Sequence, residues 1–254
     1  MRLEGKKALV TGAGSIGMGR ATALAFAREG ADVAIHYHSR PEVAEELRRE
    51  IEDAGTGRRA CCLGADLSTA AACRDLVDEA RERLGGLDIL VTAAATIVRK
   101  PILDFTDEEW DRLMDLNLRG TFACITQAAR HMKNDGTKGR IIVYGSVVQQ
   151  AAKPLQVGYG VSKAGAAHLA RGLAVEVAAH GITVNIIAPG PILTDFNRDT
   201  LADPKIAAER AKDIPMGRIG RVEDVVEAAL YFASPAAAYT TGVTIFCDGG
   251  FVLP

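Results

Sequence analysis

Residues 8–30 of the chain read ALVTGAGSIGMGRATALAFAREG, an apolar run, a glycine-rich turn and a helix-forming run in immediate succession. This order predicts a strand, a tight turn and a helix, the first unit of an α/β fold. Unpaired N–H groups at a helix N-terminus carry partial positive charge, and glycine lets a phosphate approach the backbone. The stretch therefore predicts a site for the pyrophosphate of a dinucleotide.

The rest of the chain continues this alternation of strand and helix. Strands are expected at residues 7–10, 32–36, 58–64, 89–92, 140–144, 183–188 and 244–247, and helices at 19–29, 41–54, 70–84, 108–132, 158–180 and 222–233. Several strands are apolar throughout, as in parallel sheets that are covered on both faces. Residues 1–254 are therefore expected to form one α/β domain, a doubly wound parallel sheet flanked by helices on both faces. The least regular part, residues 192–216, is expected to be either a mobile lid within that domain or a helical surface excursion.

Composition excludes several classes of function. The net charge of −2 disfavours nucleic-acid binding, which needs a basic surface. The longest apolar run, residues 89–98, is about half the length of a membrane-spanning helix, so no membrane partner is expected. The five cysteines are odd in number and lack CxxC spacing, so we expect no metal site and a reduced, cytoplasmic protein.

The end of the second expected strand bears on the choice of nucleotide. It reads HYHSRPE, with His38, Ser39 and Arg40 where an acidic residue would bind a ribose 2′-hydroxyl. A cation suits a 2′-phosphate, so NADP is favoured over NAD; the alternative is that Arg40 is a solvated residue at a helix start beside Pro41. Asp66 is expected near the adenine, or as the N-cap of the helix that begins near Thr69.

A second group of residues points to acid–base chemistry. Tyr159 and Lys163 lie four apart in VGYGVSKAG, on one face of an expected helix. An ammonium beside a phenol favours the phenolate, so Lys163 is expected to lower the pKa of Tyr159. Ser146 ends the preceding strand, at the edge of the sheet where α/β proteins bind their ligands.

Taken together, these motifs resemble the short-chain dehydrogenase/reductase family, from about Leu3 to the closing CDGGF. The matching pieces are TGAGSIGMG, Asp66-Leu67, MDLNLRGTF, YGVSK, VNIIAPGPILT, GRIGRVEDV and TTGVTIFCDGG. The resemblance implies a Rossmann-type fold, a homotetramer, and hydride transfer between NADP or NAD and a small-molecule secondary alcohol or ketone.

The family also implies roles for particular residues. A catalytic tetrad would comprise Tyr159 as proton donor or acceptor, Ser146 on the substrate oxygen, Lys163 on the nicotinamide ribose, and Asn117 beside a proton-relay water. The cofactor-binding residues would be Gly12, Gly14, Ser15, Gly17, Met18, Gly19, His38, Ser39, Arg40, Asp66, Leu67, Ala93, Ala94, Tyr159, Lys163, Pro189, Gly190, Ile192 and Thr194.

Two departures from the family pattern stand out. Four residues rather than three separate Gly12 from Gly17, so the turn is expected to bulge at Gly14. This turn is similar to that of divergent enoyl reductases, but those enzymes place the tyrosine farther from the lysine, which argues against that class. Residues 92–95 read TAAA in place of the usual NNAG, and we expect Thr92 and backbone groups to replace the lost amide hydrogen bonds.

The substrate is the least determined feature. Arg99 is expected to attract a carboxylate or phosphate, and Gln149 and Gln150 to bind hydroxyl groups, unless all three belong to solvated loops. The pattern suits a sugar, a sugar acid or a 3-oxoacyl compound, and the few aromatic residues disfavour steroids. The alternative to an enzyme is a non-catalytic nucleotide-binding sensor or partner-binding module, which would be expected to lose part of the tetrad.

Overall fold

The structure, a computed structural model, describes residues 1–55, 57–195, 197–198 and 203–253, and these form one parallel sheet in the order β3-β2-β1-β4-β5-β6-β7. The strands are β1 (Lys7–Thr11), β2 (Asp32–Tyr37), β3 (Ala60–Gly64), β4 (Ile89–Thr92), β5 (Arg140–Tyr144), β6 (Thr183–Pro189) and β7 (Thr244–Cys247). The principal helices are α1 (Met18–Arg28), α2 (Pro41–Asp53), α3 (Ala70–Leu84), α4 (Asp107–Met114), α5 (Thr121–Asn134), α6 (Val157–Val177), α8 (Pro204–Lys212) and α9 (Glu223–Ala233). The direction of winding reverses between β1 and β4, the place where such sheets open a crevice for ligands.

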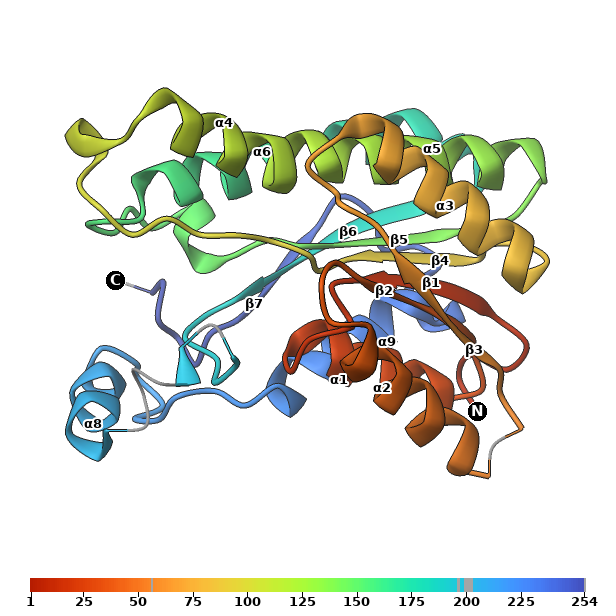
Figure 1. The fold of residues 1–254 in the computed structure, drawn as a ribbon, viewed down its shortest axis with the longest axis horizontal. Coiled ribbons are helices and arrows are strands. Elements are labelled where there is room, and N and C mark those ends of the chain that lie inside the picture. The colour runs from red at the N-terminus through yellow and green to blue at the C-terminus, as the bar shows by residue number, and fades with distance from the viewer. Residues whose placement is uncertain (56, 196, 199–202, 254) are drawn as a thin grey trace.

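Helices cover both faces of the sheet, as expected. Figure 1 shows α3, α4, α5 and α6 on one face, α1, α2 and α9 on the other, and α8 beyond the end of β7. Successive strand residues therefore enter different cores: Leu9 packs with α3 and α5, whereas Val10 packs with α1 and α9. This two-sided burial explains the continuous apolar strands, because each large aliphatic side chain stabilises the fold by roughly 1.5–3 kcal/mol when buried.

Local sequence signals fix several helix ends. Thr69 caps α3 by accepting a hydrogen bond from the Ala72 N–H at 3.3 Å, and Gly85 ends that helix with φ 71°. Thr106 and Glu109 form a reciprocal capping box at the start of α4. The strands predicted at 89–92, 140–144 and 244–247 and the helix at 70–84 have the predicted bounds, and the remaining strands differ by one or two residues.

The prediction of one continuous α-helix at residues 108–132 is wrong in one respect. A π-helical segment, η2 (Asp115–Gly120), separates α4 from α5. This wider turn brings Asn117 to full burial and lets Gly120 pack so closely that an added Cβ would lie 2.7 Å from the Leu67 carbonyl oxygen. Apolar periodicity alone does not reveal such an insertion, because the buried residues Leu113, Asn117, Gly120 and Cys124 remain three or four positions apart across η2.

The irregular segment at 192–216 contains α8, which begins at the Asp203 N-cap with Pro204 in its first turn. A helical excursion is thus confirmed for residues 204–212. Residues 196 and 199–202 of this segment lie outside the described residues, and its movement as a lid stays a prediction.

Candidate active site and nucleotide cleft

A cleft of about 360 Å³ lies at the carboxyl ends of β1, β4, β5 and β6. Ten of the predicted site residues line it: Met18, Ala93, Arg99, Ser146, Tyr159, Lys163, Pro189, Gly190, Ile192 and Thr194. They come from five separate stretches of sequence, and the parallel sheet brings them to one edge.

Ser146, Tyr159 and Lys163 form the polar centre of this cleft. Ser146 leaves β5 in an extended conformation, and its hydroxyl hydrogen-bonds to Tyr159. Lys163 is only 4% exposed and donates a hydrogen bond from Nζ to the Tyr144 carbonyl oxygen at 2.7 Å. Its Nζ lies 5.8 Å from the centre of the Tyr159 ring, as expected for side chains one helical turn apart.

Burial dominates the electrostatics of this centre. It raises the pKa of Tyr159 to about 12, against the hydrogen bond from Ser146 and the charge of Arg99, which both lower it. Burial also lowers the pKa of Lys163 to about 8. Burial thus outweighs the lowering of the Tyr159 pKa by Ser146 and Arg99, because removing a phenolate from water is costly, and the lowering expected from Lys163 stays a prediction.

Asn117 does not line the cleft. Its Oδ1 accepts from the Thr96 N–H at 2.9 Å, and its Nδ2 donates to the Thr96 carbonyl at 2.9 Å and to Ser162 Oγ at 3.0 Å. Both amide hydrogens are thus used within the protein. The side chain ties the loop after β4 to α6, the helix that carries Tyr159, so its position suits a structural support of the tetrad.

The glycine turn fits the predicted pyrophosphate. Among the described residues, no side chain caps the N-terminus of α1 and no acidic residue lies in its first turn, so no such carboxylate occupies the N–H groups of that turn. A Cβ on Gly14 would lie 2.4 Å from Tyr37 and one on Gly19 2.8 Å from the Gly12 carbonyl, so the turn packs tightly around both glycines. A Cβ on Gly17, in contrast, would meet nothing nearer than Thr194 at 3.8 Å, which leaves space for a ligand.

Sequence reasoning missed His36, which braces the glycine turn. The Gly12 N–H donates to His36 Nδ1 at 3.0 Å, and Nε2 lies 3.1 Å from the Ala65 carbonyl. Because Nδ1 accepts, the ring is neutral with its proton on Nε2, and burial lowers its pKa to about 4. The only available signal was a histidine near the end of β2, and a histidine within a strand does not by itself indicate a role.

The loops that follow β2 and β3 contain the remaining residues predicted to bind the cofactor. His38, Ser39 and Arg40 are exposed, and Arg40 lies 3.6 Å from the carboxylate of Asp195. Asp66 accepts a hydrogen bond from the Ser68 N–H at 3.0 Å and is not a helix cap, since Thr69 takes that role. Leu67 packs its side chain into the core and does not line the cleft.

The TAAA segment is compensated from the neighbouring strand. Thr11 Oγ1 accepts hydrogen bonds from the N–H groups of Ala93 at 3.0 Å and Ala94 at 3.1 Å. The buried hydroxyl of Thr92 has no partner among the described residues, so the expectation that Thr92 compensates is wrong. The buried hydroxyl of Thr11, at the end of β1, thus supplies hydrogen bonds to this segment in place of the lost amides.

Only one of the three predicted substrate residues lines the cleft. Arg99 lines the cleft, but Gln149 uses its Oε1 to accept from the Ser146 N–H at 3.3 Å, and Gln150 is exposed outside the lining. Gln149 therefore braces Ser146, and the prediction that either glutamine lines the substrate pocket is wrong. The cleft also contains residues that sequence reasoning did not select: Lys153, Asn197, Arg210, Asp213 and Phe251.

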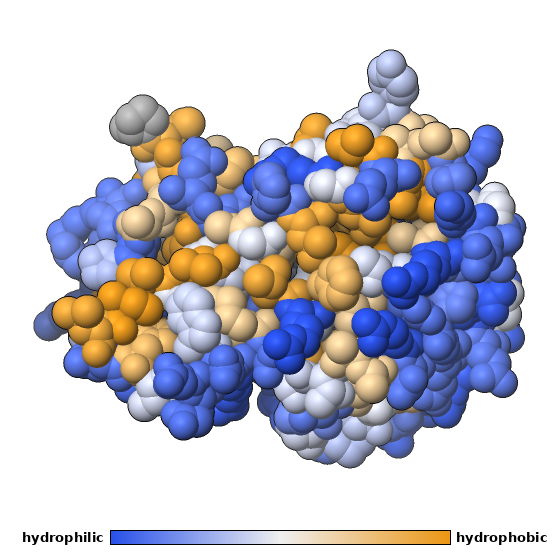
Figure 2. Space-filling view, turned by 90° about the horizontal axis from the view of Figure 1, so that it is seen from above, coloured by the Kyte–Doolittle hydropathy of each residue, from blue (hydrophilic) through white to orange (hydrophobic). Residues whose placement is uncertain are grey.

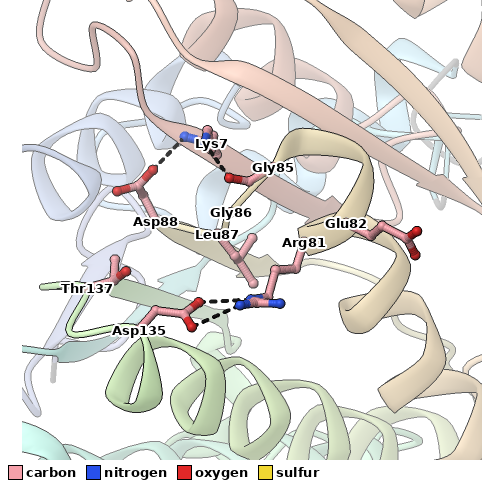
Figure 3. A pocket seen from close by; sticks show the side chains of 9 residues that line it. All are labelled: Lys7, Arg81, Glu82, Gly85, Gly86, Leu87, Asp88, Asp135 and Thr137. Atoms are coloured by element: carbon pink, nitrogen blue, oxygen red, sulfur yellow. Dashed lines mark hydrogen bonds and ion pairs between the residues drawn. The ribbon is translucent and has the colours of Figure 1, made fainter.

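A second cavity of about 490 Å³ lies at the opposite, amino-terminal edge of the sheet. Figure 3 shows its charged groups in internal contacts: Lys7 with Gly85 and Asp88, and Arg81 with both carboxylate oxygens of Asp135. These contacts pair Lys7, Arg81, Asp88 and Asp135 within the protein, and none of the predicted site residues lines this cavity. Among the described residues, no cluster of His, Cys, Asp and Glu is placed to hold a metal ion, and no helix is long and apolar enough to cross a membrane.

Comparison with known proteins finds similarity along almost the whole chain. A family model described as "Enoyl-(Acyl carrier protein) reductase" matches residues 12–252. The chain is 41% identical to 3beta-hydroxysteroid dehydrogenase 1 of Eggerthella lenta (99% of this chain, 95% of the relative) and 38% identical to glucose 1-dehydrogenase 2 of Bacillus subtilis (99% and 96%). A gluconate 5-dehydrogenase from Burkholderia cenocepacia, solved with NADP and tartrate, superposes with a TM-score of 0.92 at 35% identity, covering 100% of this chain and 97% of that one.

Proposed function

The chain belongs to the short-chain dehydrogenase/reductase family, and from that premise we propose that it oxidises or reduces a small carboxylate-bearing alcohol or ketone, with NADP preferred. It is an NAD(P)-dependent oxidoreductase of CH–OH and C=O groups, as its relatives are. The proposal of a carboxylate-bearing substrate depends on the cleft, because its lining contains both the Ser146, Tyr159 and Lys163 centre and the cationic side chains described below.

The bound nicotinamide would supply or accept the hydride. The Tyr159 hydroxyl would give a proton to the substrate oxygen, or take one from it, while Ser146 holds the same oxygen by a hydrogen bond. Lys163, fixed by the Tyr144 carbonyl, supplies the positive charge that favours the Tyr159 phenolate once a proton has left. Gln149 holds the Ser146 main chain, and Asn117 holds the loop that borders the cleft.

The N-terminus of α1 and the glycine turn would hold the pyrophosphate, with Gly17 giving the closest approach. Arg40, with His38 and Ser39 beside it, would bind the 2′-phosphate of NADP. No acidic residue follows β2 at the position that would favour the free ribose hydroxyl of NAD.

Charge in the cleft supports an anionic substrate. Arg99 and Lys153 line it from two loops and Arg210 lines it from α8, and none of the three makes an ion pair with a described residue. Arg99 also acts on the Tyr159 pKa, which places its charge near the reacting oxygen. Asp213 is the one carboxylate among the described residues of the lining, so a substrate carboxylate fits better than a neutral sugar or a flat steroid.

The test is turnover of NADP⁺ and NAD⁺, followed by nicotinamide absorbance, with sugar acids, neutral sugars, reduced 3-oxoacyl thioesters and simple alcohols. We expect sugar acids to be the best class, and Tyr159→Phe to lower kcat by roughly 10²–10⁴ while nucleotide binding is retained. Arg99→Met is expected to raise KM for acids far more than for neutral sugars. Equal use of neutral and acidic substrates by both proteins would overturn the carboxylate assignment.

We also propose a homotetramer that works in the cytoplasm without nucleic-acid partners. The exposed side of α6 carries Val157, Val161, Gly172 and Val175 at helical spacing, and Figure 2 shows apolar surface on the face that α4, α5 and α6 form. Such a stripe suits close helix packing between subunits. The five cysteines are free thiols, which suits a reducing compartment.

A further inference from the structure

The segment that follows β6 places a carboxylate on the glycine turn. The Ile16 N–H donates to Asp195 Oδ2 at 3.2 Å, and the Ile16 carbonyl accepts from the Asp195 N–H at 3.2 Å. The same Oδ2 lies 3.6 Å from a guanidinium nitrogen of Arg40. A turn N–H and the Arg40 guanidinium thus converge on one anion, and in this protein that anion is its own side chain.

These donors are the ones to which the proposed function assigns cofactor phosphates. Arg40 holds the 2′-phosphate in that proposal, and the turn that contains Ile16 faces the pyrophosphate. An incoming phosphate therefore meets donors that Asp195 already uses, and it meets the negative charge of Asp195 nearby. A guanidinium nitrogen of Arg198 lies 3.6 Å from the other carboxylate oxygen of Asp195.

We propose that Asp195 is a specificity-determining residue that limits the preference of this enzyme for NADP over NAD. This inference rests on the proposed function of Arg40. The pyrophosphate is common to both nucleotides, whereas the 2′-phosphate belongs to NADP alone. Competition for Arg40 therefore weakens NADP selectively, while competition for the Ile16 N–H alone would weaken both nucleotides equally.

The ion pair is partly open to solvent, with side-chain exposures of 46% for Arg40 and 28% for Asp195. Exposed pairs are screened, so the effect is expected to be moderate rather than absolute. The segment has a second anchor: Asn197 accepts from the Thr194 N–H at 2.9 Å and donates to the Ile192 carbonyl at 2.8 Å. Loss of the Asp195 charge should therefore leave the segment in place.

The experiment measures Kd for NADP⁺ and NAD⁺ by calorimetry on the full chain, so it needs no substrate. Asp195→Asn is expected to tighten NADP⁺ by about three- to tenfold and NAD⁺ by less than about twofold. In an Arg40→Ala background the same change should give no selective gain. Asp111→Asn, an exposed residue of α4 on the other face of the sheet, is the matched control for net charge.

Equal tightening of both nucleotides, or none, would overturn the role of Asp195. Selective tightening that persists without Arg40 would also overturn it, since the competition would then not involve that guanidinium. Failure of the unmodified protein to bind either nucleotide is a different result, which would overturn the proposed function and this inference together. Thermal unfolding of each variant shows whether a change in affinity reflects loss of fold.

Discussion

His36 shows how one buried side chain sets the shape of the nucleotide site. It accepts from the Gly12 N–H and donates to the Ala65 carbonyl, so it joins the turn after β1 to the loop after β3. Only the neutral ring can do both, because protonation of Nδ1 would place two donors against each other. The imidazole is 2% exposed, and burial lowers its pKa to about 4.

This pKa predicts a loss of stability in mild acid. Between pH 6.5 and about 4 the unfolded chain binds the His36 proton and the folded chain does not, so the free energy of unfolding falls as the pH falls. The loss attributable to His36 is expected to reach about 3 kcal/mol. Urea unfolding from pH 7 to 4 should show a shallower decline for His36→Asn, and parallel curves for the two proteins would contradict the assignment.

At the residue scale, the sequence predicted which side chains meet but not their environments. Ser146, Tyr159 and Lys163 were found from spacing and strand position, and the cleft contains all three. The direction of the Tyr159 pKa was missed because burial depends on contacts made by distant segments. Gln149 was missed for a similar reason, since its hydrogen bond to the Ser146 main chain depends on the turn geometry of η3 (Val147–Gln149).

At the element scale, the glycine turn offers a matched pair of substitutions. A Cβ at Gly19 would lie 2.8 Å from the Gly12 carbonyl, while one at Gly17 would make only ordinary contacts from an extended backbone, φ 174°. Gly19→Ala is therefore expected to destabilise the protein by roughly 1–3 kcal/mol. Gly17→Ala is expected to keep the stability and to weaken nucleotide binding at least about tenfold.

Urea unfolding and nucleotide titration of both variants check this pair. A Gly17→Ala protein that binds nucleotide normally would contradict the assignment, because the space at Gly17 would then have no ligand.

Element boundaries were largely predictable, since periodicity and caps are local. The break at η2 was not, because it depends on Asn117 finding partners in the loop after β4 and in α6.

At the scale of the whole molecule, the exposed stripe of α6 predicts assembly. Light scattering should give about four times the chain mass of 26.9 kDa. Val175 is 81% exposed and lies far along α6 from Tyr159, so Val175→Asp is expected to lower the mass without changing the cleft. Ile206→Asp, on α8, is the control for an added surface charge. A Val175→Asp protein of unchanged mass would place the interface elsewhere.

The two ends of the chain have very different surroundings. Figure 1 shows the N-terminus beside β3, whereas Phe251, toward the other end of the chain, lines the cleft with Lys153 4.3 Å from its ring centre. Arg2, in contrast, is paired with Glu29 and Glu227 on the α1 and α9 side. Because Phe251 lines the cleft, an affinity tag or a surface tether joined to the C-terminal end is expected to crowd the substrate pocket, and one joined before Met1 to leave it clear for biocatalysis on a solid support.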